Sequence, residues 1–132
     1  MIRLYHYSNK DFKGSIKPCF FGENKFSGNS RRLSEVKRAY FYLEPSNKEY
    51  YFNGSKYLYI AEVSENRLYN LNIDKKGIVK RLKNTQDIYS EVKKRGYIGL
   101  IGSNGLPCVV LFKAIKIKQR KTLTEPGIYA IL

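Results

Sequence analysis

The stretch Lys56-Tyr57-Leu58-Tyr59-Ile60-Ala61-Glu62-Val63 is the clearest strand in the chain, because aromatic and aliphatic residues fill it without a glycine or proline. Working outward, the run at 2–7 and the run Ala39-Tyr40-Phe41-Tyr42-Leu43 have the same composition and predict two further strands. Weaker patterns predict more strands at 67–71, 97–101, 108–117 and 128–132. The sequence therefore predicts a strand-rich protein.

Helical patterns are fewer and short. Residues 31–38 predict a helix capped by Ser30, and Ser46 predicts the start of another. Residues 74–82 predict a third helix, and a fourth runs to Lys94 and ends at Gly96. Strands and helices do not alternate regularly, and no glycine-rich dinucleotide motif or phosphate-loop lysine occurs. The fold class predicted is α+β.

Length and cysteine content set broad limits. A chain of 132 residues with 42% hydrophobic residues predicts a single domain over 1–132. No apolar run approaches the ~20 residues of a membrane span, and we expect no membrane association. The start of the chain lacks a signal-peptide pattern, which predicts a cytoplasmic protein with reduced thiols at Cys19 and Cys108. One histidine and two distant cysteines give no zinc-ligand spacing, and we expect no metal.

The formal net charge of +14 predicts attraction to a polyanion: a nucleic acid, a nucleoprotein or an acidic protein. The alternative is that the lysines only keep a small protein soluble. Three groups of cations stand out: a strand-like stripe of Lys116, Lys118 and Arg120; a cluster from Lys75 to Lys83; and a cluster from Arg31 to Arg38. Each group has an alternative interpretation as an ordinary solvated surface.

The only histidine, His6, lies between two tyrosines at the end of the first predicted strand. Tyr40 and Tyr51 follow with ten residues between them. An imidazole and two spaced phenol rings can bind a nucleotide by hydrogen bonding and stacking, so we expect a pocket there. The alternatives remain open: His6 can bond a backbone carbonyl, and some of the 12 tyrosines must simply fill the core.

Three blocks resemble the motifs of ADP-ribosyltransferases of the diphtheria-toxin and poly(ADP-ribose) polymerase type. Leu4-Tyr5-His6-Tyr7-Ser8 resembles their first-strand motif, and the run from Ala39 to Pro45 resembles their second block. The third block resembles Gly96-Tyr97-Ile98-Gly99-Leu100-Ile101, a turn, and Val109-Val110-Leu111-Phe112. The match covers most of the chain in the family's order. It implies a small, split, strand-rich fold that binds NAD.

The resemblance also implies roles for single residues. His6 would hydrogen-bond a ribose hydroxyl, and Tyr40 and Tyr51 would sandwich the nicotinamide ring, so these three are the expected catalytic residues. The NAD site would also include Tyr7, Ser8 and Tyr50. The family places a glutamate at the start of its last motif strand, where this chain has Cys108. The other acids linked to the motifs are Glu44, Glu49 and Glu62.

The resemblance implies an NAD-dependent mono-ADP-ribosyltransferase that modifies a protein or a nucleic acid. A small, basic, single-domain protein of this kind fits a phage or mobile-element effector. The alternative is a catalytically inactive, basic binding module or inhibitor that clamps a nucleic acid or nucleoprotein. An RNA-binding domain is a third hypothesis, since tyrosines beside lysines can stack single-stranded bases. No RNA-recognition motif supports the third hypothesis.

Overall fold

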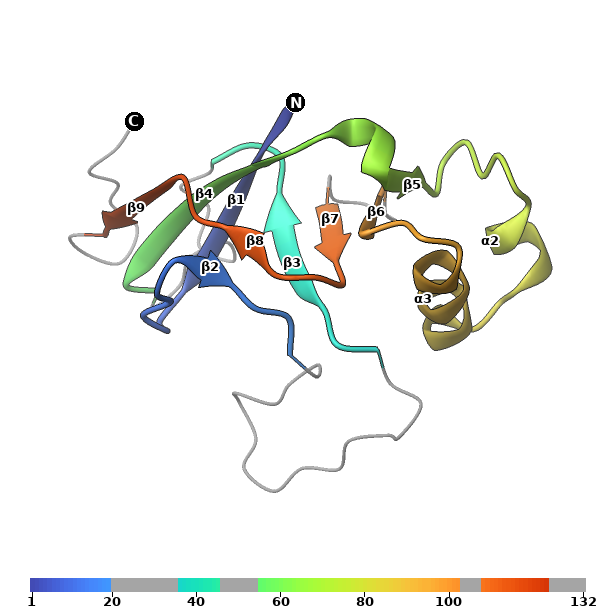
Figure 1. Cartoon of the computed structure of the whole chain (residues 1–132), viewed down its shortest axis with the longest axis horizontal. Helices are drawn as coiled ribbons and strands as arrows, with labels where there is room; N and C mark the ends of the chain where they lie inside the picture. The colour runs from blue at the N-terminus through green and yellow to red at the C-terminus, as the bar shows by residue number, and fades with distance from the viewer. Residues whose placement is uncertain (20–35, 46–54, 103–107, 124–132) are drawn as a thin grey trace, which may run out of the picture.

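The computed structural model describes residues 1–19, 36–45, 55–102 and 108–123. Its main element is a seven-stranded sheet in the order β5-β6-β7-β3-β1-β4-β9 (Figure 1). The strands are β1 (Ile2–Ser8), β3 (Ala39–Tyr42), β4 (Tyr57–Val63), β5 (Leu68–Asn70), β6 (Gly99–Ile101), β7 (Cys108–Leu111) and β9 (Gln119–Thr122). Only β5 and β6 pair in parallel among them. The predicted α+β class is confirmed.

One face of the sheet is covered by a small second sheet of β2 (Ser15–Ile16) and β8 (Ile115–Lys116). Because side chains alternate along a strand, Leu4, Phe41 and Tyr59 all point to this face. All three are fully buried, and they pack with Ile16 of β2 in one apolar cluster. We call it the first cluster.

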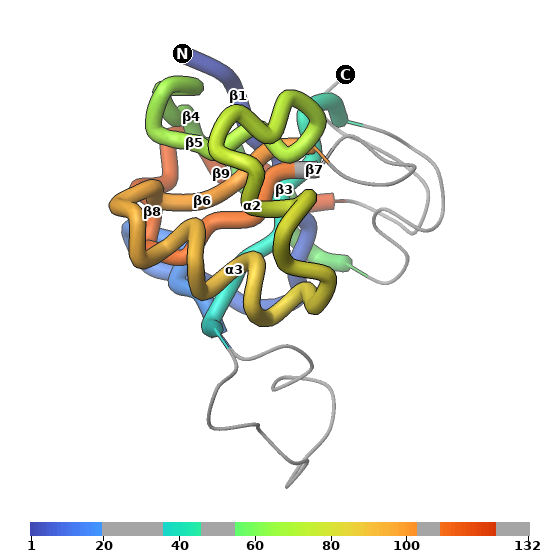
Figure 2. The backbone as a smooth tube through the Cα atoms, turned by 90° about the vertical axis from the view of Figure 1, so that its right-hand side faces the viewer, coloured from blue at the N-terminus to red at the C-terminus, as the bar shows by residue number. Residues whose placement is uncertain are grey.

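The opposite face is covered at one end by two helices, α2 (Ile78–Arg81) and α3 (Thr85–Lys94), which lie next to each other (Figure 2). A short 3₁₀ turn, η1 (Glu65–Arg67), leads into β5. Asn84 caps α3 by accepting hydrogen bonds from the backbone N–H groups of Gln86 and Asp87, at 2.8 and 3.3 Å. The helices bury Ile78 and Val92 against Tyr69, Leu100 and Val110 of the sheet, which form the second cluster.

The central strands and α3 lie close to where the sequence predicted them. The expected end of α3 is also confirmed, because Gly96 follows it in a left-handed conformation, with φ of 93°. Predicted elements at 30–35, 46–51 and 128–132 lie outside the described residues.

Three predicted elements were wrong in part. Residues 36–38 are extended rather than helical, and Arg38 forms an isolated bridge with Cys19. The predicted helix at 74–82 is reduced to α2, because Gly77 before it adopts a φ of 67°. The predicted strand at 108–117 is two strands in different sheets, β7 and β8, separated by a bend after Leu111.

No helix in the described part of the chain is long and apolar enough to cross a membrane.

Candidate functional site

The three sequence blocks form adjacent strands, with β3 between β1 and β7. Tyr5 of β1 pairs with Tyr42 of β3, and Tyr42 pairs with Cys108 of β7. Cys108, the position aligned with the glutamate of the resembled family, therefore lies in the same row of the sheet as the residue before His6. The fold thus brings residues 4–8, 39–42 and 108–111 together at the sheet centre.

His6 joins two of these strands through its side chain. Its Nδ1 lies 2.7 Å from the backbone carbonyl oxygen of Tyr40. Since a carbonyl oxygen only accepts, Nδ1 carries the hydrogen, and in the neutral ring Nε2 is left as an acceptor. Burial lowers the pKa of His6, and the bond to the carbonyl opposes this with a smaller effect. The site therefore favours a neutral imidazole of fixed tautomer.

Aromatic rings surround the imidazole. Its centroid lies 5.2 Å from that of Phe41 and 6.4 Å from that of Tyr59. Phe12, from the loop after β1, contacts it edge-on at 5.9 Å. These contacts fix the plane of the imidazole, because edge-on and tilted ring packing depends on orientation.

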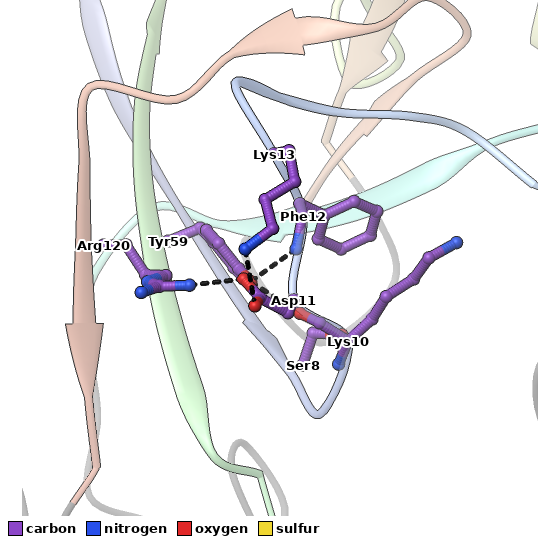
Figure 3. A network of polar contacts seen from close by, with 7 residues as sticks. All are labelled: Ser8, Lys10, Asp11, Phe12, Lys13, Tyr59 and Arg120. Carbon is purple, nitrogen blue, oxygen red and sulfur yellow. Dashed lines mark hydrogen bonds and ion pairs between the residues drawn. The ribbon is translucent and has the colours of Figure 1, made fainter.

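The loop that carries Phe12 is fastened by the buried hydroxyl of Tyr59 (Figure 3). This hydroxyl donates to the carbonyl of Lys10 at 2.5 Å and accepts from the N–H of Phe12 at 2.9 Å. The Ser8 hydroxyl accepts from the N–H of Lys10 at 3.0 Å, which shapes the start of the loop. Ser8, expected in the NAD site, thus has a defined local role.

A charged group closes the same loop from the solvent side (Figure 3). Asp11 accepts from Lys13 at 2.9 Å and from Arg120 of β9. Hydrogen bonding to Lys13 is the main reason why the pKa of Asp11 is lowered. Asp11 is exposed and paired with cations, so its carboxylate is committed to the loop.

Tyr40 meets His6 through its main chain and points its ring elsewhere. Phe41 belongs to the first cluster, and Tyr40, its neighbour on the strand, packs against the second. The Tyr40 hydroxyl lies 3.5 Å from Nη1 of Arg38. The His6 side chain therefore bonds the main chain of Tyr40, but the two rings lie on opposite faces of the sheet, so the structure does not bring them together.

Arg38, which sequence analysis placed among surface cations, is a buried residue on the side of β3 where the Tyr40 ring packs. It is 5% exposed, donates from Nη2 to Oε1 of Gln86 at 2.7 Å, and lies over the ring of Tyr89 at 4.8 Å. Its Nε donates to the carbonyl of Val36 at 3.0 Å. A sequence signal for the burial of Arg38 existed, because Arg38 and Tyr40 are two residues apart and share one face of an extended chain.

Of the other residues expected in the NAD site, Tyr7 is described by the structure and Tyr50 and Tyr51 are not. The rings of Tyr7 and Tyr42 lie 6.3 Å apart on β1 and β3. Tyr50 and Tyr51, expected on the NAD-facing wall, lie outside the described residues, as does Glu49. The position of Tyr51 relative to His6 therefore stays a prediction.

Glu62 and Glu44, the two described acids linked to the motifs, lie at a distance from His6 in the sheet. Glu62 pairs with Arg3, whereas His6 pairs with Tyr59, so about 10 Å of strand separates Glu62 from the row of His6. Glu62 is also bound to Arg3 and Lys118, each at 3.9 Å. Glu44 follows the end of β3 and is exposed. Within the described ranges, no three His, Cys, Asp or Glu side chains group to hold a metal ion.

The chain matches no family model, no curated protein and no solved structure in the comparisons made.

Proposed function

We propose that this chain is an ADP-ribosyltransferase-type domain that binds NAD at the β1–β3 junction and transfers ADP-ribose to a macromolecule. The observation that carries the proposal is the His6 side chain, bonded through Nδ1 to the Tyr40 carbonyl between two motif strands. Support also comes from the position of the third block, whose strand β7 lies directly beside β3.

The fixed imidazole suits the role that the resemblance implies. With Nδ1 held by a carbonyl, Nε2 of the neutral ring can accept a hydrogen bond from a ribose hydroxyl. Cleavage of the nicotinamide–ribose bond builds positive charge on the ribose, and holding NAD in a bent pose favours that change. In this proposal of a cytoplasmic enzyme, His6 orients the ribose and Tyr51 stacks on the nicotinamide. Tyr40 contributes the carbonyl that holds His6, because its ring packs on the opposite face of the sheet.

A second candidate function follows from Cys108. Where the family has a glutamate, β7 begins with a residue that carries no carboxylate, and Glu62 lies about 10 Å along the sheet from the row of His6. A domain with this site would bind NAD, or would bind a nucleic acid or nucleoprotein through its basic surface, without releasing nicotinamide. It would then act as a binding module or inhibitor.

Binding of labelled NAD to purified variants tests the site. His6→Asn retains an amide that can donate to the Tyr40 carbonyl but removes Nε2, so we expect the fold to persist and NAD affinity to fall at least about tenfold. Tyr40→Ala removes a ring on the opposite face and keeps the carbonyl that His6 binds, so it should leave NAD affinity unchanged. Tyr97→Ala is the matched control, because Tyr97 is a half-buried tyrosine that packs on Tyr69 at the helical end. Equal NAD affinity in the parent and in folded His6→Asn would reject the site.

Transfer is tested separately. The protein is incubated with NAD labelled in the adenosine portion and a cell lysate, with and without nuclease, and free nicotinamide is measured. Label in protein or nucleic acid supports the transferase. NAD binding with no nicotinamide release and no label transfer selects the inactive binding module.

A further inference from the structure

An open hollow of about 670 Å³ lies between α3 and the segment that leads into β3, away from the His6 ring contacts. Its apolar lining comes from Pro18, Val36 and Phe112, of which the last two are buried. Its polar lining comes from Lys37, Lys93, Lys94 and Ser90. We call this feature the lysine hollow.

The geometry of α3 places its part of the lining on one side. Ser90, Lys93 and Lys94 are spaced i, i+3 and i+4, so they share a helix face. Gln86, one turn earlier, accepts from the N–H of Val36 at 3.3 Å and from Arg38. These bonds hold the segment that contains Lys37 beside α3. The backbone positions of the three lysines are therefore fixed relative to one another.

The described lining of the lysine hollow carries positive charge. Among the lining residues that the structure describes none is acidic, and all three lysines are exposed. Glu91, the acid closest in sequence to Lys93 and Lys94, is bonded to Arg95 at 2.7 Å, which is the main reason why its pKa is lowered; the charge of Lys94 contributes less. A concentration of positive charge around a concave surface attracts phosphate groups.

The stripe of Lys116, Lys118 and Arg120 is a weaker candidate for phosphate binding than the lysine hollow. The structure breaks it, because β8 pairs with β2 and β9 pairs with β4. Lys118 lies 3.9 Å from Glu62, and Arg120 is bonded to Asp11 and stacked on Tyr57 at 4.9 Å. Two of its three cations are therefore already engaged with acids.

The residue types indicate which polyanion fits. Lysine is depleted from protein–protein interfaces, whose cores are enriched in aromatic residues and methionine. The exposed large hydrophobic residues of the described chain are Met1, Ile73 and Val79, and none of them lines the hollow. Lysine binds phosphate as a point charge and contacts to phosphate carry no base sequence. This combination favours a nucleic acid backbone over an acidic protein.

We propose that the lysine hollow binds the phosphate backbone of a nucleic acid, without sequence specificity. Binding itself is independent of NAD. The statement that this nucleic acid is the ADP-ribose acceptor rests on the proposed function.

The test is fluorescence anisotropy with a labelled 20-base-pair DNA duplex at several salt concentrations. The variant is Lys93→Glu with Lys94→Glu, and the control is Lys116→Glu with Lys118→Glu, which changes the net charge by the same amount. We expect the first pair to weaken binding at least about tenfold and to reduce the salt slope by about 2, and the control to change affinity less than about threefold. Thermal melting confirms that both variants fold.

Other results would overturn the proposal. These are no binding by the parent at 50 mM salt, or equal losses in the two charge-matched pairs, which would indicate a diffuse charge effect. Competition by poly-glutamate as strong, per charge, as that by unlabelled duplex would assign the hollow to an acidic protein instead. Folded His6→Asn should bind the duplex normally, so failure of the NAD site and failure of the lysine hollow give different results.

Discussion

Strand β1 is held in different ways on its two sides. Toward β4 it forms seven register pairs, from Ile2 opposite Val63 to Ser8 opposite Tyr57. Toward β3 it forms one, between Tyr5 and Tyr42, and the next link is the bond from His6 to the Tyr40 carbonyl. Backbone polar groups inside a protein need partners, and where the ladder ends a side chain supplies one. Continuous backbone pairing therefore holds β1 to β4, whereas a side-chain bond extends the short pairing with β3.

The largest effect should come from breaking the β4 side. Tyr59 is fully buried opposite His6, so Tyr59→Ala should lower the free energy of unfolding by about 3–5 kcal/mol, measured by urea denaturation. Tyr59→Phe keeps the ring and loses two hydrogen bonds, and should cost about 1–2 kcal/mol. Equal losses in the two variants would show that the hydroxyl, rather than the ring, dominates.

A smaller loss is expected on the β3 side. His6→Ala removes one hydrogen bond and part of a packed ring, and should lower the free energy of unfolding by about 2 kcal/mol. His6→Asn should lose about 1 kcal/mol or less, since its amide can bond the same carbonyl. If Asn destabilises as much as Ala, the bond between His6 and Tyr40 contributes little to joining the strands.

The pH dependence of stability reports the burial of the same side chain. Because burial lowers the pKa of His6 below its ordinary value of about 6.5, the unfolded chain binds a proton more readily than the folded one. Stability is therefore complete above pH 6.5 and decreases as the pH falls through 6.5 toward the folded pKa. His6 is the only histidine, so His6→Asn should reduce the change in melting temperature between pH 5 and 7. A variant that keeps the parent's slope would place the titration elsewhere.

The smallest effect is expected at the exposed end of the loop. Asp11→Asn weakens ion pairs with Lys13 and Arg120 on the surface, where such pairs contribute little. Its urea midpoint should match that of the parent, because the Tyr59 hydroxyl still fastens the loop. A clear loss of stability would mean that Asp11, and not Tyr59, holds Phe12 against His6.

Local patterns in the sequence were sufficient for most of the large elements. Aromatic runs located β1, β3 and β4, and Gly96 located the end of α3. Local patterns failed where the outcome depended on distant partners. The residues after Leu111 have strand composition, but pairing with β2 moves 115–116 into another sheet.

The candidate site shows the same division. His6 was identified as a candidate site residue because it is the only histidine in the chain and lies at the end of a predicted strand. That its Nδ1 bonds the carbonyl of Tyr40, and that Tyr40 turns its ring to the second cluster, required the register of β1 and β3. Likewise, composition alone did not separate the buried Arg38 from the exposed Lys37 beside it.

The sequence by itself determined the strand-rich α+β class, the large positive charge and the position of the sole imidazole, because these depend on composition and on patterns within one element. Only the tertiary structure decided that Arg38 is buried against Gln86 and that lysines 56 residues apart line one hollow. Gly99 makes the same point, since a Cβ there would lie 2.1 Å from the carbonyl oxygen of Val110 on the neighbouring strand. The physical reason is that burial and charge neutralisation are set by contacts between segments remote in sequence, which no local pattern encodes.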